Sequence, residues 1–267
     1  MKNRALWASL VMLLLGAGVP GQAQAPAVPA REALHLFLLV GQSNMAGRGK
    51  VEAADREPTP RVLMLDKAGA WLPAVDPMHF DKPVAGVGLG RSFAAQVLDA
   101  TPGITVGLIP AAAGGSPIDT WTPGGYHDQT KSHPWDDAVA RARVAMPAGT
   151  LKAILWHQGE SDATPELAPA YEAKLHALIA RFRDTLGAPD VPFIVGQLGR
   201  FEGVAWDDAR RTVDAAHRAL PDKVRRTAFV SSDGLVHGGD QVHFDTASLR
   251  ELGRRYAIAY ATFTAGR

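Results

Sequence analysis

The sequence predicts an α/β fold in three layers, with a mostly parallel central sheet between two layers of helices. Short hydrophobic runs alternate along the chain with longer amphipathic stretches, which is the pattern of repeated strand–helix units. The hydrophobic runs are apolar at consecutive positions rather than at alternate ones, as expected for strands buried on both faces. Most of the segments after these runs carry polar residues and glycine, which indicates one site at the carboxyl edge of the sheet.

The elements follow from these patterns in order along the chain. The apolar runs predict strands at 35–41, 61–65, 104–110, 151–156, 191–198 and 227–231. The amphipathic stretches predict helices at 88–99, 135–146, 165–186, 204–219 and 246–263. Two Gly/Pro-rich loops, 66–87 and 111–134, are long enough to line a site.

The first 25 residues are typical of a signal peptide. Lys2 and Arg4 precede an apolar run, and small residues follow it, with cleavage expected after Ala23 or Ala25. Because the run is too short to span a bilayer, we expect export to the periplasm or the medium of a bacterium, without a membrane anchor.

The charge balance and the absence of cysteine exclude several kinds of partner and chemistry. The 28 basic and 27 acidic residues nearly cancel, which does not favour nucleic acid or an anionic membrane as a partner. There is no cysteine among the 267 residues, so disulfides, thiolate catalysis and cysteine-bound zinc are excluded. We expect a disordered lead-in at 26–34 and a single domain at 35–267.

Ser43 is the first candidate for chemistry. It lies in FLLVGQSNMAGRG, at the point where a buried strand ends. One interpretation is an N-cap for a helix that starts at Asn44, and the other is a nucleophile. Met45 stands where the second glycine of a G-x-S-x-G elbow would be, so this is not an α/β-hydrolase motif, and the flanking pattern leaves both interpretations open.

A histidine near the C-terminus favours the nucleophile. His243 follows Asp240 by three residues, a spacing that lets the carboxylate reach the imidazole while the other ring nitrogen faces the crevice. Asp245 is expected to cap the last helix. Asp233 and His237 form a rival pair in the same stretch, which we rank lower because no helix follows His237 directly.

An acyl-transfer site also needs hydrogen-bond donors for the oxyanion. The candidates are the N–H of Ser43, the N–H of Gly115 in AGGS and the side-chain amide of Gln158 in WHQGE. Each also has an ordinary structural interpretation: a tight turn for the glycine, a loop brace for the glutamine. Their position after three different strands favours a site.

Four blocks in this order, GQSNMAG, GGSPIDTW, WHQGESD and DQVHFD, resemble those of the SGNH-type hydrolases. The resemblance is closest to the family 6 carbohydrate esterases and the related sialate O-acetylesterase domain. It implies a flavodoxin-like fold and a serine esterase that removes O-acetyl groups from sugars. It implies Ser43 as nucleophile, His243 as base and Asp240 as acid.

The resemblance also implies a set of supporting residues. Gly115 and Gln158 become oxyanion donors beside the Ser43 amide, with Gln158 in place of the asparagine that is usual in the wider superfamily. Glu160 is expected to be a structural carboxylate that bonds the Ser43 loop, with Gln42 and Asn44 as further supports. No metal or cofactor is implied, and the partner is an acetylated carbohydrate such as xylan, sialic acid or a pectic glycan.

Other interpretations remain open. The same site is compatible with an esterase or thioesterase for other small acyl groups, and the fold with a non-catalytic carbohydrate-binding module. A metal hydrolase is disfavoured because its candidate ligands lack a known spacing; these are His127, Asp128, His133, Asp136 and Asp137. Four aromatic residues are expected either to stack on sugars or to fill the core; these are Trp71, Trp121, Tyr126 and Trp135.

Overall fold

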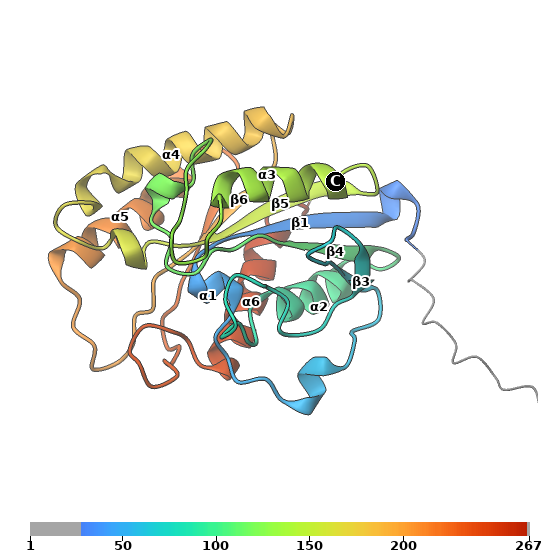
Figure 1. Ribbon diagram of the computed structural model, residues 1–267, viewed down its shortest axis with the longest axis horizontal. Coiled ribbons are helices and arrows are strands. Elements are labelled where there is room, and N and C mark those ends of the chain that lie inside the picture. The colour runs from blue at the N-terminus through green and yellow to red at the C-terminus, as the bar shows by residue number, and fades with distance from the viewer. Residues whose placement is uncertain (1–27, 266–267) are drawn as a thin grey trace, which may run out of the picture.

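The computed structural model describes residues 28–265 and shows a seven-stranded sheet between two layers of helices (Figure 1). The signal peptide expected at residues 1–25 therefore lies outside the described residues. The strand order is β3-β2-β4-β1-β5-β6-β7. Neighbouring strands are parallel except for the antiparallel pair β2 and β3 at one edge. The predicted α/β class with a mostly parallel sheet is confirmed.

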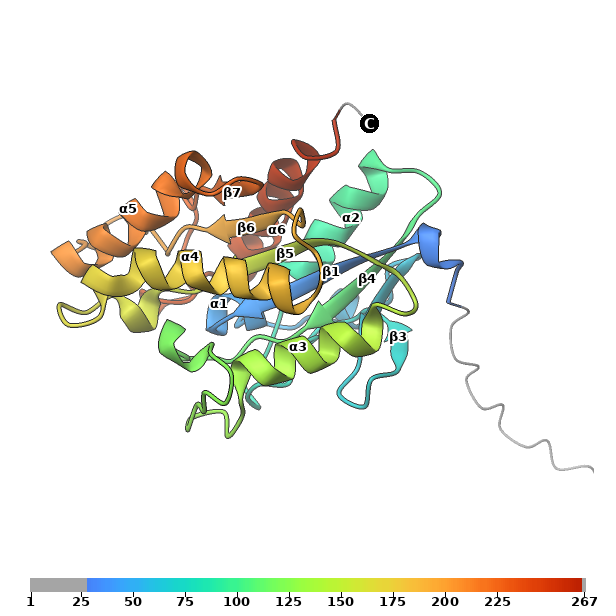
Figure 2. The same cartoon turned by 90° about the horizontal axis from the view of Figure 1, so that it is seen from above.

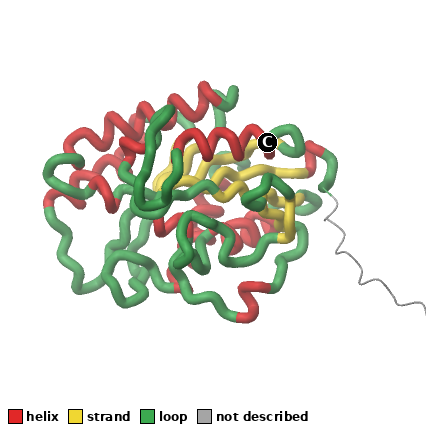
Figure 3. The backbone as a smooth tube through the Cα atoms, in the orientation of Figure 1, coloured by secondary structure: helices red, strands yellow, loops and turns green. Residues whose placement is uncertain are grey.

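The strands and helices alternate along most of the chain. Figure 3 shows the strands gathered in the middle of the molecule, with helices above and below them. The strands are β1 (Leu34–Gly41), β2 (Val62–Leu65), β3 (Trp71–Pro73), β4 (Thr105–Pro110), β5 (Thr150–His157), β6 (Phe193–Gly196) and β7 (Thr227–Val230). The α-helices are α1 (Ser43–Ala46), α2 (Gly90–Ala100), α3 (Pro134–Ala145), α4 (Ala168–Thr185), α5 (Asp208–Lys223) and α6 (Thr246–Ala261).

Strand β1 explains why its sequence is apolar at consecutive positions. Successive side chains of a strand point to opposite faces of the sheet, and both faces of β1 are covered. Leu36 and Leu38 join the core on the side of α3, α4 and α5. Phe37 and Leu39 join the core on the side of α2 and α6. Figure 1 shows the two helical layers on opposite sides of the sheet, and Figure 2 looks down onto the layer that holds α3, α4 and α5.

The six predicted strands and five predicted helices all occur, with ends shifted by a few residues. Helix α1 was not predicted, nor was strand β3, which pairs only with β2 at the edge, nor were the short 3₁₀ turns. The lead-in expected at 26–34 is wrong at its end, because residues 31–33 form a 3₁₀ turn and β1 begins at Leu34.

The position of β1 explains where a site can form. From β1 the chain first builds β2, β3 and β4 on one side of it, and then β5, β6 and β7 on the other. Ligands in open parallel sheets bind at the carboxyl ends of strands where the direction of building reverses. Ser43 follows β1 at this point.

Candidate active site

Ser43, His243 and Asp240 form a continuous hydrogen-bonded row at the end of β1. Ser43 Oγ lies 2.9 Å from His243 Nε2, and His243 Nδ1 lies 2.5 Å from Asp240 Oδ2. Because the carboxylate only accepts, Nδ1 carries the ring proton and Nε2 accepts from the serine hydroxyl. The Ser43 residue is 7% exposed, whereas the His243 side chain is 28% exposed, so the row runs from the fold's interior to its surface.

The short helix α1 presents the serine. Gly41 has φ +131, and a Cβ there would lie 2.1 Å from the carbonyl oxygen of His157, so only glycine allows β1 to turn beside β5. Ser43 is then the first residue of α1, and Gln42 is the N-cap. The N-cap interpretation of Ser43 is therefore wrong, because its hydroxyl bonds His243 instead.

Asp240 is held by its own turn. Its Oδ1 accepts from the backbone N–H groups of Val242 and His243, at 2.9 and 2.8 Å. Partial burial acts to raise the pKa of Asp240, but the hydrogen bonds from His243 and Val242 outweigh it and lower this pKa to about 2. Asp240 is therefore ionised at any ordinary pH and orients the His243 ring.

Asn44 joins the serine to the histidine segment. Its Nδ2 donates to the carbonyl oxygen of Val242 at 3.1 Å, and its Oδ1 accepts from the N–H of Phe244 at 3.1 Å. These two bonds grip the backbone on both sides of His243, from the residue next to Ser43. A single fully buried side chain thus fixes the separation between the Ser43 hydroxyl and the imidazole.

Two further contacts tie this arrangement to the loop after β5. Glu160 Oε1 accepts the second amide hydrogen of Asn44, at 2.6 Å. Gln42 Oε1 accepts from the N–H of Gly159 and of Ser161, at 3.5 and 3.4 Å. The loop after β1 is therefore tied to the loop after β5 by two side chains that flank Ser43.

Gly115 lies on the other side of Ser43, after β4. It has φ +85, a backbone conformation that residues with a side chain rarely adopt, so the position favours glycine. His127 Nε2 lies 3.3 Å from the carbonyl oxygen of Gly114, which holds the peptide group that carries the Gly115 N–H. Within residues 28–265, that N–H makes no hydrogen bond.

Gln158 does not have the geometry of an oxyanion donor, in contrast to the sequence prediction. Its side chain is fully buried. Its Nε2 donates to the carbonyl oxygen of Ser116 at 3.0 Å and to Asp162 Oδ2 at 2.5 Å, which occupies both amide hydrogens. Tyr171 donates to its Oε1 at 2.9 Å. Gln158 therefore joins the loop after β4 to the loop after β5 through hydrogen bonds of its buried side chain.

The rival pair, Asp233 and His237, is not assembled as a pair. His237 Nδ1 accepts from the N–H groups of Gly239 and Gln241, at 2.9 and 3.3 Å. Asp233 Oδ1 instead lies 3.7 Å from Arg200 Nη1. His237 therefore shapes the turn that carries Asp240.

The loop after β4 is fixed by two residues that sequence reasoning missed. Asp81 Oδ2 accepts from Arg48 Nη2 at 2.7 Å and from the N–H of Gly114 at 2.9 Å. The only available signal was position: Arg48 directly follows the GQSNMAG block, and Asp81 lies in one of the two long Gly/Pro-rich loops.

Two of the four aromatic residues considered for sugar stacking belong to the core. Trp121 and Trp135 are 0% and 3% exposed, so for them the stacking interpretation is wrong. Trp71 packs in part against the same core, and Tyr126 is exposed beside His133. Among residues 28–265, no three His, Cys, Asp or Glu side chains gather as a metal ion would require.

Comparison with known sequences identifies the family. The family described as carbohydrate esterase, sialic acid-specific acetylesterase matches residues 33–262. The chain belongs to this family. A probable carbohydrate esterase of Arabidopsis thaliana is 32% identical over 246 residues, which cover 84% of this chain and 89% of the relative.

Solved structures of carbohydrate esterases share the fold. The crystal structure of an Arabidopsis thaliana protein superposes with a TM-score of 0.75 at 30% identity, covering 85% of this chain and 98% of that one. NanS gives 0.71 at 17% identity, covering 90% and 100%. A carbohydrate acetylesterase of Xanthomonas citri gives 0.67 at 20% identity, covering 88% and 57%. In the part of the chain that the structure describes, no helix is long and apolar enough to cross a bilayer.

Proposed function

We propose that this carbohydrate esterase is a serine enzyme that removes O-acetyl groups from glycans. The observation that carries the proposal is the row Ser43 Oγ, His243 Nε2, His243 Nδ1 and Asp240 Oδ2, with separations of 2.9 and 2.5 Å. This is the arrangement in which an imidazole takes the serine proton while a carboxylate fixes its tautomer.

The reaction follows from the donors and acceptors of the row. His243 Nε2 takes the proton of Ser43 as Oγ bonds to the acetyl carbonyl carbon. The sugar oxygen then leaves that carbon and takes the proton from Nε2. Water, deprotonated by the same nitrogen, attacks the acetyl-enzyme, releases acetate and restores the Ser43 hydroxyl.

The oxyanion of each tetrahedral intermediate needs preorganised donors. The backbone N–H groups of Ser43 and Gly115 are our candidates. Gln158 contributes indirectly, because it holds the carbonyl of Ser116, the residue after Gly115. We therefore revise its role from donor to positioning residue.

The substrate class rests on the family and its relatives. The family is described as sialic acid-specific, and a carbohydrate acetylesterase is among the similar structures. We propose an acetylated glycan, with xylan, sialic acid and pectin as the substrates to compare. The N-terminal residues Met1–Ala25, with their signal-like pattern, support export of the enzyme.

Acetate release tests this function. Purified wild type and Ser43→Ala are incubated with acetylated xylan, O-acetylated sialic acid and acetylated pectin. We expect the wild type to release acetate from at least one of them and the variant to release none above the uncatalysed rate. Equal release by both proteins contradicts the proposal. If the wild type releases no acetate, the same pair of proteins is assayed on butyrate and longer acyl esters, and acid release by the wild type alone favours the alternative esterase.

A further inference from the structure

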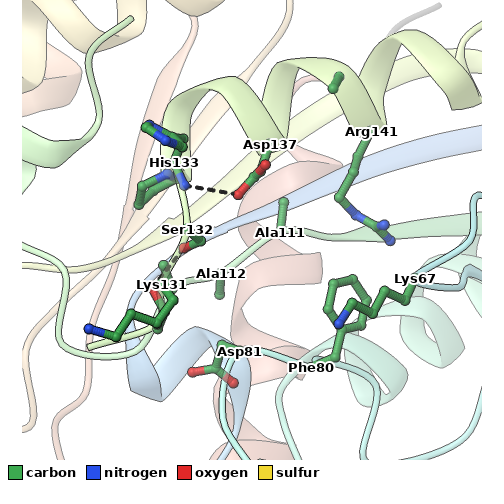
Figure 4. A pocket seen from close by; sticks show the side chains of 14 residues that line it. Lys67, Phe80, Asp81, Ala111, Ala112, Lys131, Ser132, His133, Asp137 and Arg141 are labelled. Atoms are coloured by element: carbon green, nitrogen blue, oxygen red, sulfur yellow. Dashed lines mark hydrogen bonds between the residues drawn. The ribbon is translucent and has the colours of Figure 1, made fainter. Parts of the chain in front are cut away.

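A cavity of about 430 Å³ lies beside the loop after β4. Figure 4 shows side chains facing it from two opposite segments, with Phe80 and Asp81 on one side and Lys131 and Ser132 on the other. Residues 111–113 line it between them. The size is within the range of small-molecule sites.

The cavity adjoins the proposed catalytic row. Its lining residue Ala113 donates its N–H to the carbonyl oxygen of Gly41 at 2.9 Å, two residues before Ser43. Its lining residue Asp81 bonds the N–H of Gly114 at 2.9 Å, the residue before the candidate oxyanion donor. A glycan with its acetyl group at Ser43 therefore has this cavity next to it.

Phe80 provides an exposed aromatic face at the cavity. Its side chain is among the exposed large hydrophobic residues, at 41% exposure. The Arg141 guanidinium carbon lies 4.6 Å from the ring centroid, which supports the ring from one face and keeps it in place. An aromatic face of this kind is a platform for the C–H face of a sugar ring.

Asp81 fixes one wall of the cavity. Its side chain is 1% exposed, and Oδ2 takes both of its hydrogen bonds, from Arg48 and Gly114. The buried Oδ1 has no partner among the described residues. Because Oδ1 is closed off from solvent, Asp81 acts on the cavity through Oδ2, which fixes Arg48 and the N–H of Gly114.

The charges around the cavity favour a neutral ring over an acidic one. Arg141 donates to the carbonyl oxygens of Leu65, Asp66 and Pro110, so its fork is directed at the backbone. Lys131 pairs with Asp128 at 2.6 Å. Of the Lys and Arg side chains that line the cavity, the exposed Lys67 is then the one left to attract a carboxylate. Proteins typically recognise a carboxylate with a bidentate arginine instead.

We propose that this cavity is a subsite for a second, neutral sugar ring of the glycan that carries the acetyl group. The ring stacks on Phe80, beside the wall that Asp81 fixes through Arg48 and Gly114. The subsite rests on the proposed function, and it makes the enzyme selective for acetylated oligosaccharides over acetylated monosaccharides.

The test compares Phe80→Ala with wild type on acetylated xylo-oligosaccharides and on acetylated xylose. The ratio of the two kcat/KM values is expected to fall about fivefold in the variant, the amount typical of one aromatic contact. Phe80→Trp is expected to restore it. Ile258→Ala, which removes an apolar side chain that is 64% exposed on α6, is the matched control and should keep the wild-type ratio. An unchanged ratio in Phe80→Ala overturns the subsite.

A binding experiment separates this proposal from the esterase proposal. Calorimetric titration of Ser43→Ala with unacetylated xylotetraose measures the subsite without turnover. We expect binding that weakens about fivefold on addition of Phe80→Ala and that is no tighter for tetragalacturonic acid. Binding with no acetate release by the wild type overturns the esterase alone; no binding, or tighter binding of the acidic sugar, overturns the neutral subsite.

Discussion

The segment 231–245 holds two aspartate–histidine pairs, and they lie in opposite environments. His243 gives its Nδ1 proton to a carboxylate and turns Nε2 toward Ser43. His237 uses Nδ1 to accept two backbone N–H groups, and its ring packs edge-on against Phe201 at 5.2 Å. Similar residues at similar spacing thus make one reactive side chain and one turn support.

The difference comes from contacts distant in sequence. Asn44 grips the backbone on both sides of His243, whereas Asp233 is turned toward Arg200. The two turns are nevertheless joined, because Gly238, next to His237, donates its N–H to the carbonyl oxygen of His243 at 2.8 Å. An aspartate near a histidine in sequence is therefore not enough for a catalytic pair. Contacts from distant residues must also hold the histidine so that Nε2 faces the serine.

Replacing each histidine gives the largest contrast. His243→Ala is expected to lower kcat for acetate release by at least about 10⁴-fold, because no base remains for Ser43. His237→Ala is expected to lower it by only about tenfold, since it loosens the turn and leaves the base. Steady-state kinetics on both purified variants measures this, with circular dichroism to check folding. Equal losses would remove the distinction between the two residues.

Replacing each aspartate sharpens the comparison. Asp240→Asn keeps the size of the side chain but removes the acceptor that fixes the His243 tautomer, so we expect kcat to fall about 10³-fold. Asp233→Asn is the matched control and is expected to stay within about twofold of wild type. A larger loss in the control would mean that the rival pair takes part in catalysis.

The clamp on His243 predicts a smaller effect. Asn44→Ala is expected to lower kcat about 30-fold with little change in KM, and to lower the free energy of unfolding by about 2 kcal/mol, because buried backbone partners lose their bonds. Glu160→Ala should lower kcat in the same way. Glu160→Gln should restore most of it, since an amide oxygen still accepts from Asn44. No rescue by glutamine would show that the charge of Glu160 matters instead.

The smallest effect concerns stability at acidic pH. The pKa of Asp240 is about 2 in the folded protein and about 3.9 in an unfolded chain. A lowered folded pKa contributes stability above pH 4, and this contribution is lost as the pH falls toward 2. Thermal unfolding of wild type and Asp240→Asn should therefore differ by a few degrees at pH 6 and converge near pH 2. A constant difference would contradict the hydrogen bonds to the ionised Asp240 carboxylate as the source of this stability.

Much of the architecture was predictable because it depends on local pattern. Long apolar runs and amphipathic stretches fixed the six main strands and five main helices. Strand β3 was not predicted because it has three residues, one of them proline. A strand of this length is too short to show any periodicity. Helix α1 was not predicted because it is a single turn of four residues, which is too short to show a helical pattern.

The candidate site was predictable only in part. The motifs bring Ser43, Asp240 and His243 to one edge, where the hydrogen bonds join them. The direction of a side chain within a buried loop is set by tertiary contacts, however, and Gln158 shows this. Its side-chain amide donates to Asp162 and Ser116 rather than facing Ser43. No pattern in WHQGE indicates this direction.

The most direct test of the account is covalent labelling of the nucleophile. The wild type is treated with a fluorophosphonate, which reacts with serines activated by a neighbouring base, and the modified peptide is identified by mass spectrometry. We predict a single label on Ser43, absent from Ser43→Ala and strongly slowed in His243→Ala but not in His237→Ala. Labelling of another serine, or equal labelling of the wild type and His243→Ala, would contradict the proposed catalytic row.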